Sequence, residues 1–295
     1  MNKPDILIIG AGPAGLTAAI QLKRYGFTPI LLERDHVGGL LRNANRVENY
    51  PGFPNGIPGP KLIALFEKQT RRVGVEVTFD KVTRLDYDGE VFLVDAIHNT
   101  FSAKYVIVAT GTKPKQLPVK IPAQVEGKVF SEVWPLVGVK NKHIIIVGAG
   151  DAAFDYALNL SRKNTVTILN RGHETSCLPL LEKWAAENPS IVYRAGVAVR
   201  GIEADKTAGR LRVACVRRDG DATLDCDYLI FAIGREPWLD FLTESVKMQE
   251  RTLIESGKLY FVGDVHNGPF RQTAIAAGDG LRAAMQIYAN MEKVR

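Results

Sequence analysis

The chain has 295 residues, 46% of them hydrophobic and 24% charged, and a formal net charge of +6. This length predicts two domains, and the composition is that of a globular protein rather than a disordered chain. The mild, dispersed positive charge argues against nucleic-acid binding and suits an acidic protein partner or phosphate groups. No apolar run approaches the roughly 18 residues of a membrane span. The strand-like start, MNKPDILIIG, leaves no room for a signal peptide, so a cytoplasmic protein is expected.

The N-terminus predicts a strand, a glycine turn and a helix. An apolar run ends in Gly10-Ala-Gly-Pro-Ala-Gly15, helical apolar spacing follows, and a second strand is expected at Pro29–Glu33. In such a turn the first glycine bends the chain, the second admits a pyrophosphate and the third allows close helix packing. The helix N-terminus then attracts the phosphates. The predicted dinucleotide-binding residues are Gly10, Gly12, Pro13, Ala14, Gly15 and the strand-end carboxylate Glu33.

The same unit recurs 138 residues later, as His143-Ile-Ile-Ile-Val-Gly-Ala-Gly-Asp-Ala-Ala153. The offset places Arg171, at the end of an expected strand Thr167–Arg171, where the first unit has Glu33. A carboxylate there accepts hydrogen bonds from ribose hydroxyls, whereas a cation suits a 2′-phosphate. The first site is therefore predicted to bind FAD and the second NADPH. The predicted NADPH residues of this unit are Gly148, Gly150, Asp151, Ala152, Ala153, Asn170 and Arg171.

A second repeat, of offset 123, relates Lys104–Pro114 to Asp227–Pro237. Both read as strands that end in a glycine turn followed by proline, so each closes one dinucleotide domain. We predict an α/β protein with two Rossmann-like, three-layer domains. The FAD domain is expected at 1–111 and 238–295, and the NAD(P)H domain is inserted at 112–237 through a two-stranded hinge. The turn residues predicted to contact the cofactors are Ala109, Thr110 and Gly111 for FAD, and Ile233, Gly234 and Arg235 for NADPH.

Several further motifs resemble those of the bacterial-type, low-molecular-weight thioredoxin reductases. They are Gly38-Gly-Leu-Leu41, Val47-Glu-Asn-Tyr-Pro-Gly-Phe53, Ala109-Thr-Gly111, Gly263-Asp-Val265 and Arg271-Gln272. The resemblance implies that Asp264 contacts the flavin ribityl chain and that Asn49 lies near the flavin. It places Gln272 and Thr273 at the flavin pyrimidine, where a helix N-terminus stabilises negative charge. It also implies a homodimer and FAD contacts at Arg34, Gly39, Leu40, Val82, Gly263 and Arg271.

The chain departs from this family at the redox disulfide. Counted back from Gly148, the two cysteine positions hold Ser131 and Trp134, and Pro135 replaces the acidic proton donor. Trp134 is expected to lie against the flavin, to fill the space left by the missing disulfide, or to be a hydrophobic hinge residue. The other catalytic candidate is His266, close in sequence to Asp264, although neither residue is assigned a certain role. No metal site is predicted.

A second departure concerns the phosphate-binding run. The family often has His-Arg-Arg-x-x-x-Arg, whereas this chain reads Asn170-Arg-Gly-His-Glu-Thr-Ser176. Since one arginine survives, the sequence favours NADPH and leaves NADH open.

The cysteines offer one possible replacement pair. A hairpin is expected from the strand Leu211–Val216, a turn at Arg218–Asp221 and the strand Leu224–Phe231. If the turn is centred on Gly220-Asp221, Cys215 and Cys226 lie opposite each other on the two strands. If the turn is shifted by one residue, they do not. Whether they pair is left open.

The leading functional hypothesis is electron transfer from NADPH through FAD directly to a separate acceptor. Thioredoxin-reductase-like ferredoxin–NADP reductases often share the aspartate of Asp151, but they usually carry a C-terminal extension, and this chain stops at Arg295. Ferredoxin is therefore a candidate beside flavodoxin-like proteins, quinones, free flavins and oxygen. Two alternatives are a disulfide reductase acting on a partner's cysteine pair and a non-catalytic flavin- or nucleotide-binding redox sensor.

Overall fold

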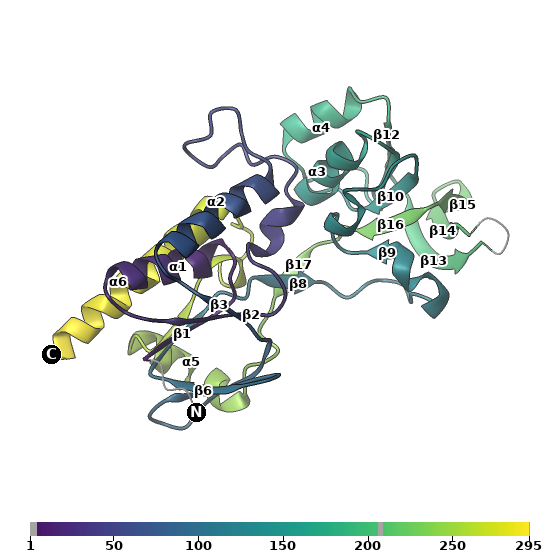
Figure 1. Ribbon diagram of the computed structural model, residues 1–295. Coiled ribbons are helices and arrows are strands. Elements are labelled where there is room, and N and C mark those ends of the chain that lie inside the picture. Colours follow the sequence, from purple (N-terminus) through teal and green to yellow (C-terminus); the bar gives the residue numbers. More distant parts are fainter. Residues whose placement is uncertain (1–4, 206–208, 295) are drawn as a thin grey trace. The chain divides into compact units, whose positions relative to one another are not determined.

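The computed structural model describes residues 5–205 and 209–294 and divides into two compact units (Figure 1). The first unit contains the chain up to Arg42, Val47–Lys113 and the chain from Glu236 onward. The second contains Asn43–Arg46 and Pro114–Arg235. Each unit has its own hydrophobic core.

The first unit is built on a five-stranded parallel sheet. Its strands, in spatial order, are β18 (Leu259–Phe261), β7 (Tyr105–Val108), β1 (Ile6–Ile9), β2 (Ile30–Glu33) and β3 (Val77–Phe79). All four residues of β1 are buried, which explains its uninterrupted apolar sequence. The sheet therefore forms the middle layer of the unit.

Helices cover one face of this sheet and an antiparallel sheet covers the other. The helices are α1 (Pro13–Arg24), α2 (Gly59–Arg72) and α6 (Thr273–Val294). The second sheet is β4 (Val82–Tyr87), β5 (Phe92–Ala96) and β6 (Thr100–Ala103), with α5 (Glu244–Glu255) packed beside it. Short 3₁₀ helices, η1 (Gly39–Asn43) and η4 (Gly263–Val265), complete the unit. The expected three-layer arrangement is confirmed.

The close contact between α1 and α6, visible as parallel ribbons in Figure 1, depends on one glycine. A Cβ atom placed on Gly280 would lie 2.0 Å from the carbonyl oxygen of Ala14. Only a residue without a side chain allows the two backbones to approach this closely. The helix that begins with the first glycine turn is thereby fixed against the C-terminal helix.

The second unit repeats the plan. Its parallel sheet is β12 (Ile191–Arg194), β11 (Thr165–Leu169), β10 (His143–Val147), β16 (Tyr228–Phe231) and β9 (Val129–Phe130). The helices are α3 (Asp151–Leu160) and α4 (Pro179–Ala186), with η2 (Ala123–Lys128) and η3 (Trp134–Leu136). An antiparallel sheet contains β13 (Ala198–Ala204), β14 (Leu211–Arg217) and β15 (Gly220–Cys226). Both halves of the sequence repeat thus fold as Rossmann-like α/β units.

The expected hairpin forms with its turn inside the expected segment Arg218–Asp221, but the expected second strand is wrong, because β15 begins at Gly220 and ends at Cys226. The turn lies at Arg218-Asp219, and β15 pairs Cys226 with Leu211 and Cys215 with Ala222. The run Leu224–Phe231 is divided because its second part, β16, joins the parallel sheet instead. Asp227 marks the division, since its carboxylate accepts a hydrogen bond from the His143 N–H at 2.8 Å.

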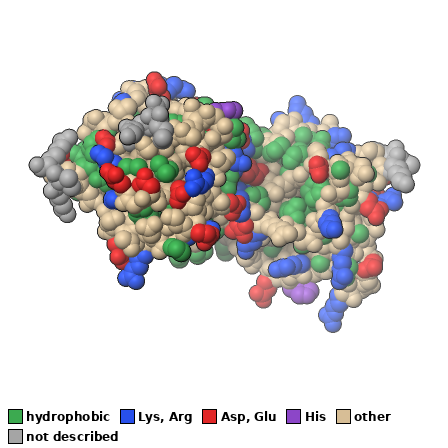
Figure 2. Space-filling view, turned by 90° about the horizontal axis from the view of Figure 1, so that it is seen from below, with side chains coloured by type: hydrophobic (Ala, Val, Ile, Leu, Met, Phe, Trp, Pro, Cys, Tyr) green, Lys and Arg blue, Asp and Glu red, His purple; other side chains and the backbone are tan. Residues whose placement is uncertain are grey.

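The chain passes between the two units through a pair of short strands. These are β8 (Thr112–Pro114) and β17 (Arg235–Pro237), which form a two-stranded sheet of their own. They lie where the second sequence repeat ends in glycine and proline. No helix in the described residues is long and apolar enough to cross a membrane. Figure 2 shows basic and acidic side chains interspersed on the visible face.

Candidate functional site

Two of the three glycines in the first turn are required by the fold. Gly10 has a φ of +105°, and a Cβ there would lie 2.4 Å from the Ala109 carbonyl oxygen. At Gly15 a Cβ would lie 1.9 Å from the carbonyl oxygen of Gly10. These residues allow the turn to form and α1 to pack against the end of β1, as the fingerprint predicts.

The remaining glycine, Gly12, is not required by the fold. Its φ is −73°, which any residue adopts, and a Cβ there would meet nothing within 4 Å. Gly12 immediately precedes α1, whose first N–H groups point outward from the helix. The open space is therefore suited to a pyrophosphate, and Gly39 borders it, since its ideal Cβ lies 3.7 Å from the Cα of Gly12.

Glu33 is held in a fixed orientation at the end of β2. Its side chain is buried, and its Oε2 accepts a hydrogen bond from the Ala11 N–H at 2.8 Å. Its Oε1 accepts another from the Asp35 N–H at 3.0 Å. A carboxylate has about four acceptor positions, so this one retains capacity for ribose hydroxyls. The geometry fits the unphosphorylated ribose that the sequence predicts.

At the expected flavin end, the structure brings together two residues that are 223 positions apart in sequence. The Asn49 Nδ2 donates a hydrogen bond to the Gln272 Oε1 at 2.9 Å. Gln272 directly precedes α6, which begins at Thr273. Asn49 belongs to a loop closed by two backbone hydrogen bonds between Val47 and Ile57. The loop therefore presents Asn49 at the N-terminus of α6.

Asp264 lies in η4. This segment is hydrogen-bonded to Asp279 of α6, a residue to which the sequence alone assigned no role. The Oδ2 of Asp279 accepts hydrogen bonds from the Gly263 N–H at 3.3 Å and from the Asn267 Nδ2 at 2.6 Å. Arg282 neutralises it with an ion pair of 2.7 Å. The signal in the sequence is a carboxylate on the otherwise apolar buried face of the last helix.

The other predicted FAD residues lie in the same unit. Thr110 donates its hydroxyl hydrogen bond to the Trp238 carbonyl oxygen at 2.8 Å, and His266 is exposed directly after η4. The rest are placed by their elements: Pro13 and Ala14 at the start of α1, Arg34 after β2, Leu40 in η1, Val82 at the start of β4, Ala109 and Gly111 after β7, and Arg271 before α6.

In the second unit, the first glycine of the turn is again required by the fold and the second is not. Gly148 has a φ of +149°, and a Cβ there would lie 2.3 Å from the Ala232 carbonyl oxygen. Gly150 has an ordinary φ of −98°, and its ideal Cβ would have its nearest neighbour, the Ser176 Oγ, at 3.5 Å. The second glycine is again left open for a ligand, beside the N-terminus of α3.

The loop after β11 folds back across this turn. The Ser176 N–H donates to the Ala149 carbonyl oxygen at 2.9 Å, and the Leu178 N–H donates to the Asp151 Oδ1 at 2.8 Å. Asn170 shapes the loop from inside, because its Oδ1 accepts from the Gly172 N–H and its Nδ2 donates to the Glu174 carbonyl oxygen. Asn170 therefore positions the loop, and Ser176, which received no role from the sequence, ties it to the glycine turn.

Arg171 lies just beyond β11 and is exposed, so it is not part of the strand that the sequence predicts. We expect Arg171→Glu to lower kcat/KM for NADPH about tenfold or more, the effect of losing one charge-assisted hydrogen bond to the 2′-phosphate. The kcat/KM for NADH should not fall. Steady-state kinetics with both nucleotides measure this, and Arg212→Glu, on an exposed strand of the hairpin, is the control. Equal losses for both nucleotides would contradict the assignment.

The remaining predicted NADPH residues are placed at the same turn or at its closing strand. Ala152 and Ala153 belong to the first turn of α3, and Ile233 and Gly234 follow β16. Arg235 begins β17, and its guanidinium lies 3.6 Å from the Glu132 Oε1.

Trp134 is 41% exposed and starts η3. Its neighbours Val133 and Leu136 are the residues that enter the hydrophobic core. Its backbone N–H donates to the Asn43 Oδ1 at 3.1 Å. The side chain is thus at the surface of its own unit rather than filling that unit's core.

The three cysteines are all free. Cys215 and Cys226 are buried, and burial raises the pKa of the Cys215 thiol and raises that of Cys226 to about 12. Burial also raises the pKa of Cys177, which is partly buried. Since the thiolate is the reactive form, these thiols are poorly suited to disulfide exchange at neutral pH.

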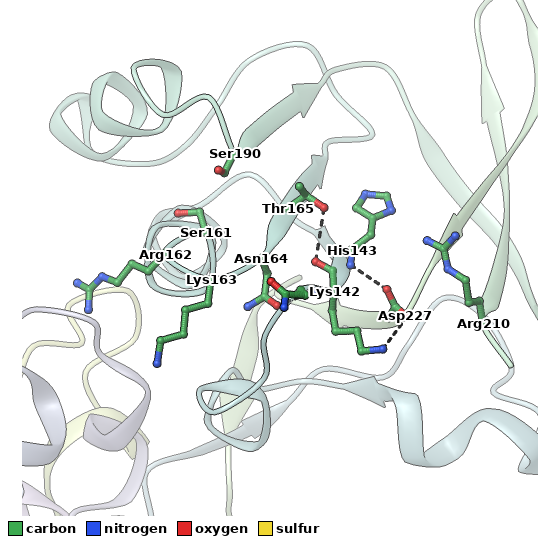
Figure 3. Close-up of a pocket in the computed structure, with 11 residues that line it drawn as sticks. Lys142, His143, Ser161, Arg162, Lys163, Asn164, Thr165, Ser190, Arg210 and Asp227 are labelled. Atoms are coloured by element: carbon green, nitrogen blue, oxygen red, sulfur yellow. Dashed lines mark hydrogen bonds and ion pairs between the residues drawn. The ribbon is translucent and has the colours of Figure 1, made fainter. Parts of the chain in front are cut away.

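A separate open pocket of about 550 Å³ lies at the amino-terminal ends of β10 and β11 (Figure 3). Its lining includes Lys142, Lys163, Arg210 and Asp227, with Lys142 paired to Asp227 at 3.5 Å. Cofactors of such folds bind at the carboxyl ends of the strands, so this pocket is not the nucleotide site. Among the described residues, no group of three or more His, Cys, Asp or Glu could hold a metal ion.

Comparisons with known proteins show the family to which this fold belongs. Residues 4–280 match the family described as pyridine nucleotide-disulphide oxidoreductase. The chain is 30% identical to a thioredoxin reductase of Rickettsia felis and 31% identical to one of Rickettsia conorii, in each case over 98% of both chains. A crystal structure of Lactococcus lactis thioredoxin reductase (FR conformation) superposes with a TM-score of 0.87 at 26% identity, covering 98% of this chain and 99% of that one.

The family uses FAD and NADPH, and the open second glycine of each turn is compatible with both groups. The chain therefore belongs to the pyridine nucleotide-disulphide oxidoreductase family and is a thioredoxin reductase-like, NAD(P)H-dependent FAD oxidoreductase.

Proposed function

We propose that this enzyme passes electrons from NADPH through FAD directly to a separate acceptor, without an internal redox disulfide. The observation that carries the proposal is the identity of Ser131 and Trp134 at the positions of the family's two redox cysteines. A serine hydroxyl cannot replace a thiol in disulfide exchange. The three cysteines present do not substitute, because Cys215 and Cys226 face other residues across the hairpin and the pKa of every thiol is raised.

In this proposal the bound flavin supplies the redox chemistry, and the protein supplies position and charge. Gln272 and Thr273 lie at the N-terminus of α6, which would stabilise negative charge on the reduced cofactor. The hydrogen bond from Asn49 orients Gln272. The hydrogen bond from the Gly263 N–H to Asp279 holds η4, the segment that contains Asp264. Trp134 and His266 stay candidates for contact with the flavin edge.

The cysteine-free enzyme tests the proposal. We expect a variant with Cys177, Cys215 and Cys226 all changed to serine to keep its FAD and its NADPH oxidation. Stopped-flow mixing with NADPH under anaerobic conditions should bleach the flavin absorbance at the wild-type rate. Reoxidation is then followed with a ferredoxin, a flavodoxin, a quinone and oxygen. Loss of NADPH oxidation in a folded, FAD-loaded variant would show that a cysteine carries electrons.

A second candidate function is reduction of a disulfide in a partner protein. The family description and the names of the Rickettsia relatives favour it, since both refer to disulfide or thioredoxin reduction. If the cysteine-free variant reduces thioredoxin in an insulin-coupled assay, the partner's disulfide is reduced without an internal thiol. If only the wild-type enzyme does so, an internal thiol is needed. A non-catalytic redox sensor would fail to consume NADPH with any acceptor.

We further propose that the enzyme is a homodimer that uses an exposed face of α6. Leu281 and Met285 are 40% and 51% exposed and lie four residues apart on α6, so their side chains share one face of the helix. Apolar side chains grouped in this way commonly mark a protein interface. The mass in solution, measured by light scattering, tests the dimer, and monomeric Leu281→Glu protein would place the interface on this face.

The proposed location is the cytoplasm. All three cysteines are free, and free thiols persist in reducing compartments. Cell fractionation with an antibody against the protein measures this.

A further inference from the structure

A tryptophan that the dinucleotide motifs do not explain lies at the expected adenine end of the FAD site. The guanidinium carbon of Arg34 lies 3.5 Å from the centroid of the Trp238 ring. Lys81 approaches the same ring, with its Nζ at 5.8 Å. Arg34 directly follows Glu33, the residue placed at the ribose. The stack is therefore adjacent to the sugar position.

The backbone of Trp238 is anchored at the carboxyl end of β7. Its N–H donates to the Gly111 carbonyl oxygen at 3.1 Å, and its own carbonyl oxygen accepts the Thr110 hydroxyl at 2.8 Å. Arg34, by contrast, follows β2. Because β1 lies between β7 and β2 in the sheet, the Trp238–Arg34 stack reaches across the carboxyl end of β1. That is where the first glycine turn begins.

The chemistry of the stack suits an aromatic base. A guanidinium that lies over an aromatic ring is attracted to its face and loses side-chain freedom. The planar group then offers its opposite face, and nucleobases stack on arginine planes as they do on aromatic rings. Because Arg34 directly follows Glu33, a base attached to a ribose at Glu33 would lie near that plane.

We propose that Trp238 holds the Arg34 guanidinium as a stacking platform for the adenine of FAD, so that Trp238 favours FAD over FMN. The proposal rests on the FAD site described above. Trp238 acts through Arg34 and is a positioning residue. Its effect is confined to the adenylate half of the cofactor.

The test compares ligands that carry or lack adenine. FAD, FMN and ADP are titrated into deflavinated wild-type protein and into Trp238→Ala, Trp238→Phe and Arg34→Met. We expect Trp238→Ala and Arg34→Met to weaken FAD and ADP by a similar factor of about ten, the contribution of one stacked cation and base. FMN binding should be unchanged, and Trp238→Phe should restore most of the FAD affinity.

Glu236→Gln is the matched control, because Glu236 lies on β17 two residues away and its side chain pairs with Lys113 instead. Equal weakening of FAD and FMN in Trp238→Ala would overturn the proposal, since it would show general damage to the site. Unchanged FAD affinity in both Trp238→Ala and Arg34→Met would overturn it as well. Gly12→Val separates this from failure of the FAD site itself, because that variant should lose FAD whether or not the platform exists.

Discussion

The Gly12→Val variant is expected to fold and to be purified without yellow flavin. The backbone at Gly12 has an ordinary φ of −73°, and no atom of the protein lies within 4 Å of the position of a Cβ. A side chain there would instead enter the space beside the N-terminus of α1. Displacing a pyrophosphate from those N–H groups removes charge-assisted hydrogen bonds and should weaken FAD binding on the order of 100-fold or more.

The measurements are flavin content, the dissociation constant for FAD and the thermal unfolding of the deflavinated protein. Gly15→Ala is the contrasting control, because its Cβ would lie 1.9 Å from the Gly10 carbonyl oxygen. That variant should lower the stability of the deflavinated protein, by about 1–3 kcal/mol or more. Gly12→Val should leave it nearly unchanged. Full flavin content in Gly12→Val would show that the first glycine turn does not hold the pyrophosphate.

The sequence predicts the architecture well because its signals are local. A fully buried parallel strand is apolar throughout, as β1 is, and β10 has the same kind of buried apolar centre. A glycine turn followed by helical spacing marks the next element. The repeats at offsets of 138 and 123 place both nucleotide units and the strands that close them. The two-unit α/β fold follows from these patterns without any knowledge of long-range contacts.

The details that depend on pairing could not be predicted in the same way. The hairpin register depends on where the turn lies, and the alternating burial of β14 and β15 does not fix that position. A turn centred on Gly220-Asp221 would pair Cys215 with Cys226, whereas the turn at Arg218-Asp219 pairs Cys226 with Leu211. The stretch Leu224–Phe231 reads as one strand, yet Asp227 separates two strands of different sheets. Local propensity does not distinguish these outcomes.

The candidate site shows the same limit. The glycines and Glu33 are recognisable from spacing, whereas Asp279 and Trp238 become interpretable only when their partners are known. Asp279 accepts a hydrogen bond from a backbone N–H 16 positions earlier, and Trp238 stacks on Arg34, which lies far earlier in the chain. These contacts carry no periodic signal in the sequence.

The second large effect is expected at Gly150, the matching glycine of the NADPH unit. We expect Gly150→Val to keep FAD, but we expect its rate of flavin reduction by NADPH to fall on the order of 100-fold. Gly150 has an ordinary φ of −98° and precedes α3, so a side chain obstructs the approach of the nucleotide pyrophosphate to that helix. The Ser176 Oγ, 3.5 Å from the Cβ position, leaves room for the first carbon of a side chain.

Stopped-flow reduction separates loss of NADPH binding from damage to the flavin. Dithionite, which needs no nucleotide site, should still bleach the flavin of Gly150→Val at the wild-type rate. The control is Gly148→Ala, where a φ of +149° and a carbonyl oxygen only 2.3 Å from the Cβ predict loss of stability instead. If Gly150→Val is reduced by NADPH as fast as wild type, the second glycine turn is not the nucleotide site. If dithionite reduction also slows, the substitution has altered the flavin environment rather than nucleotide binding.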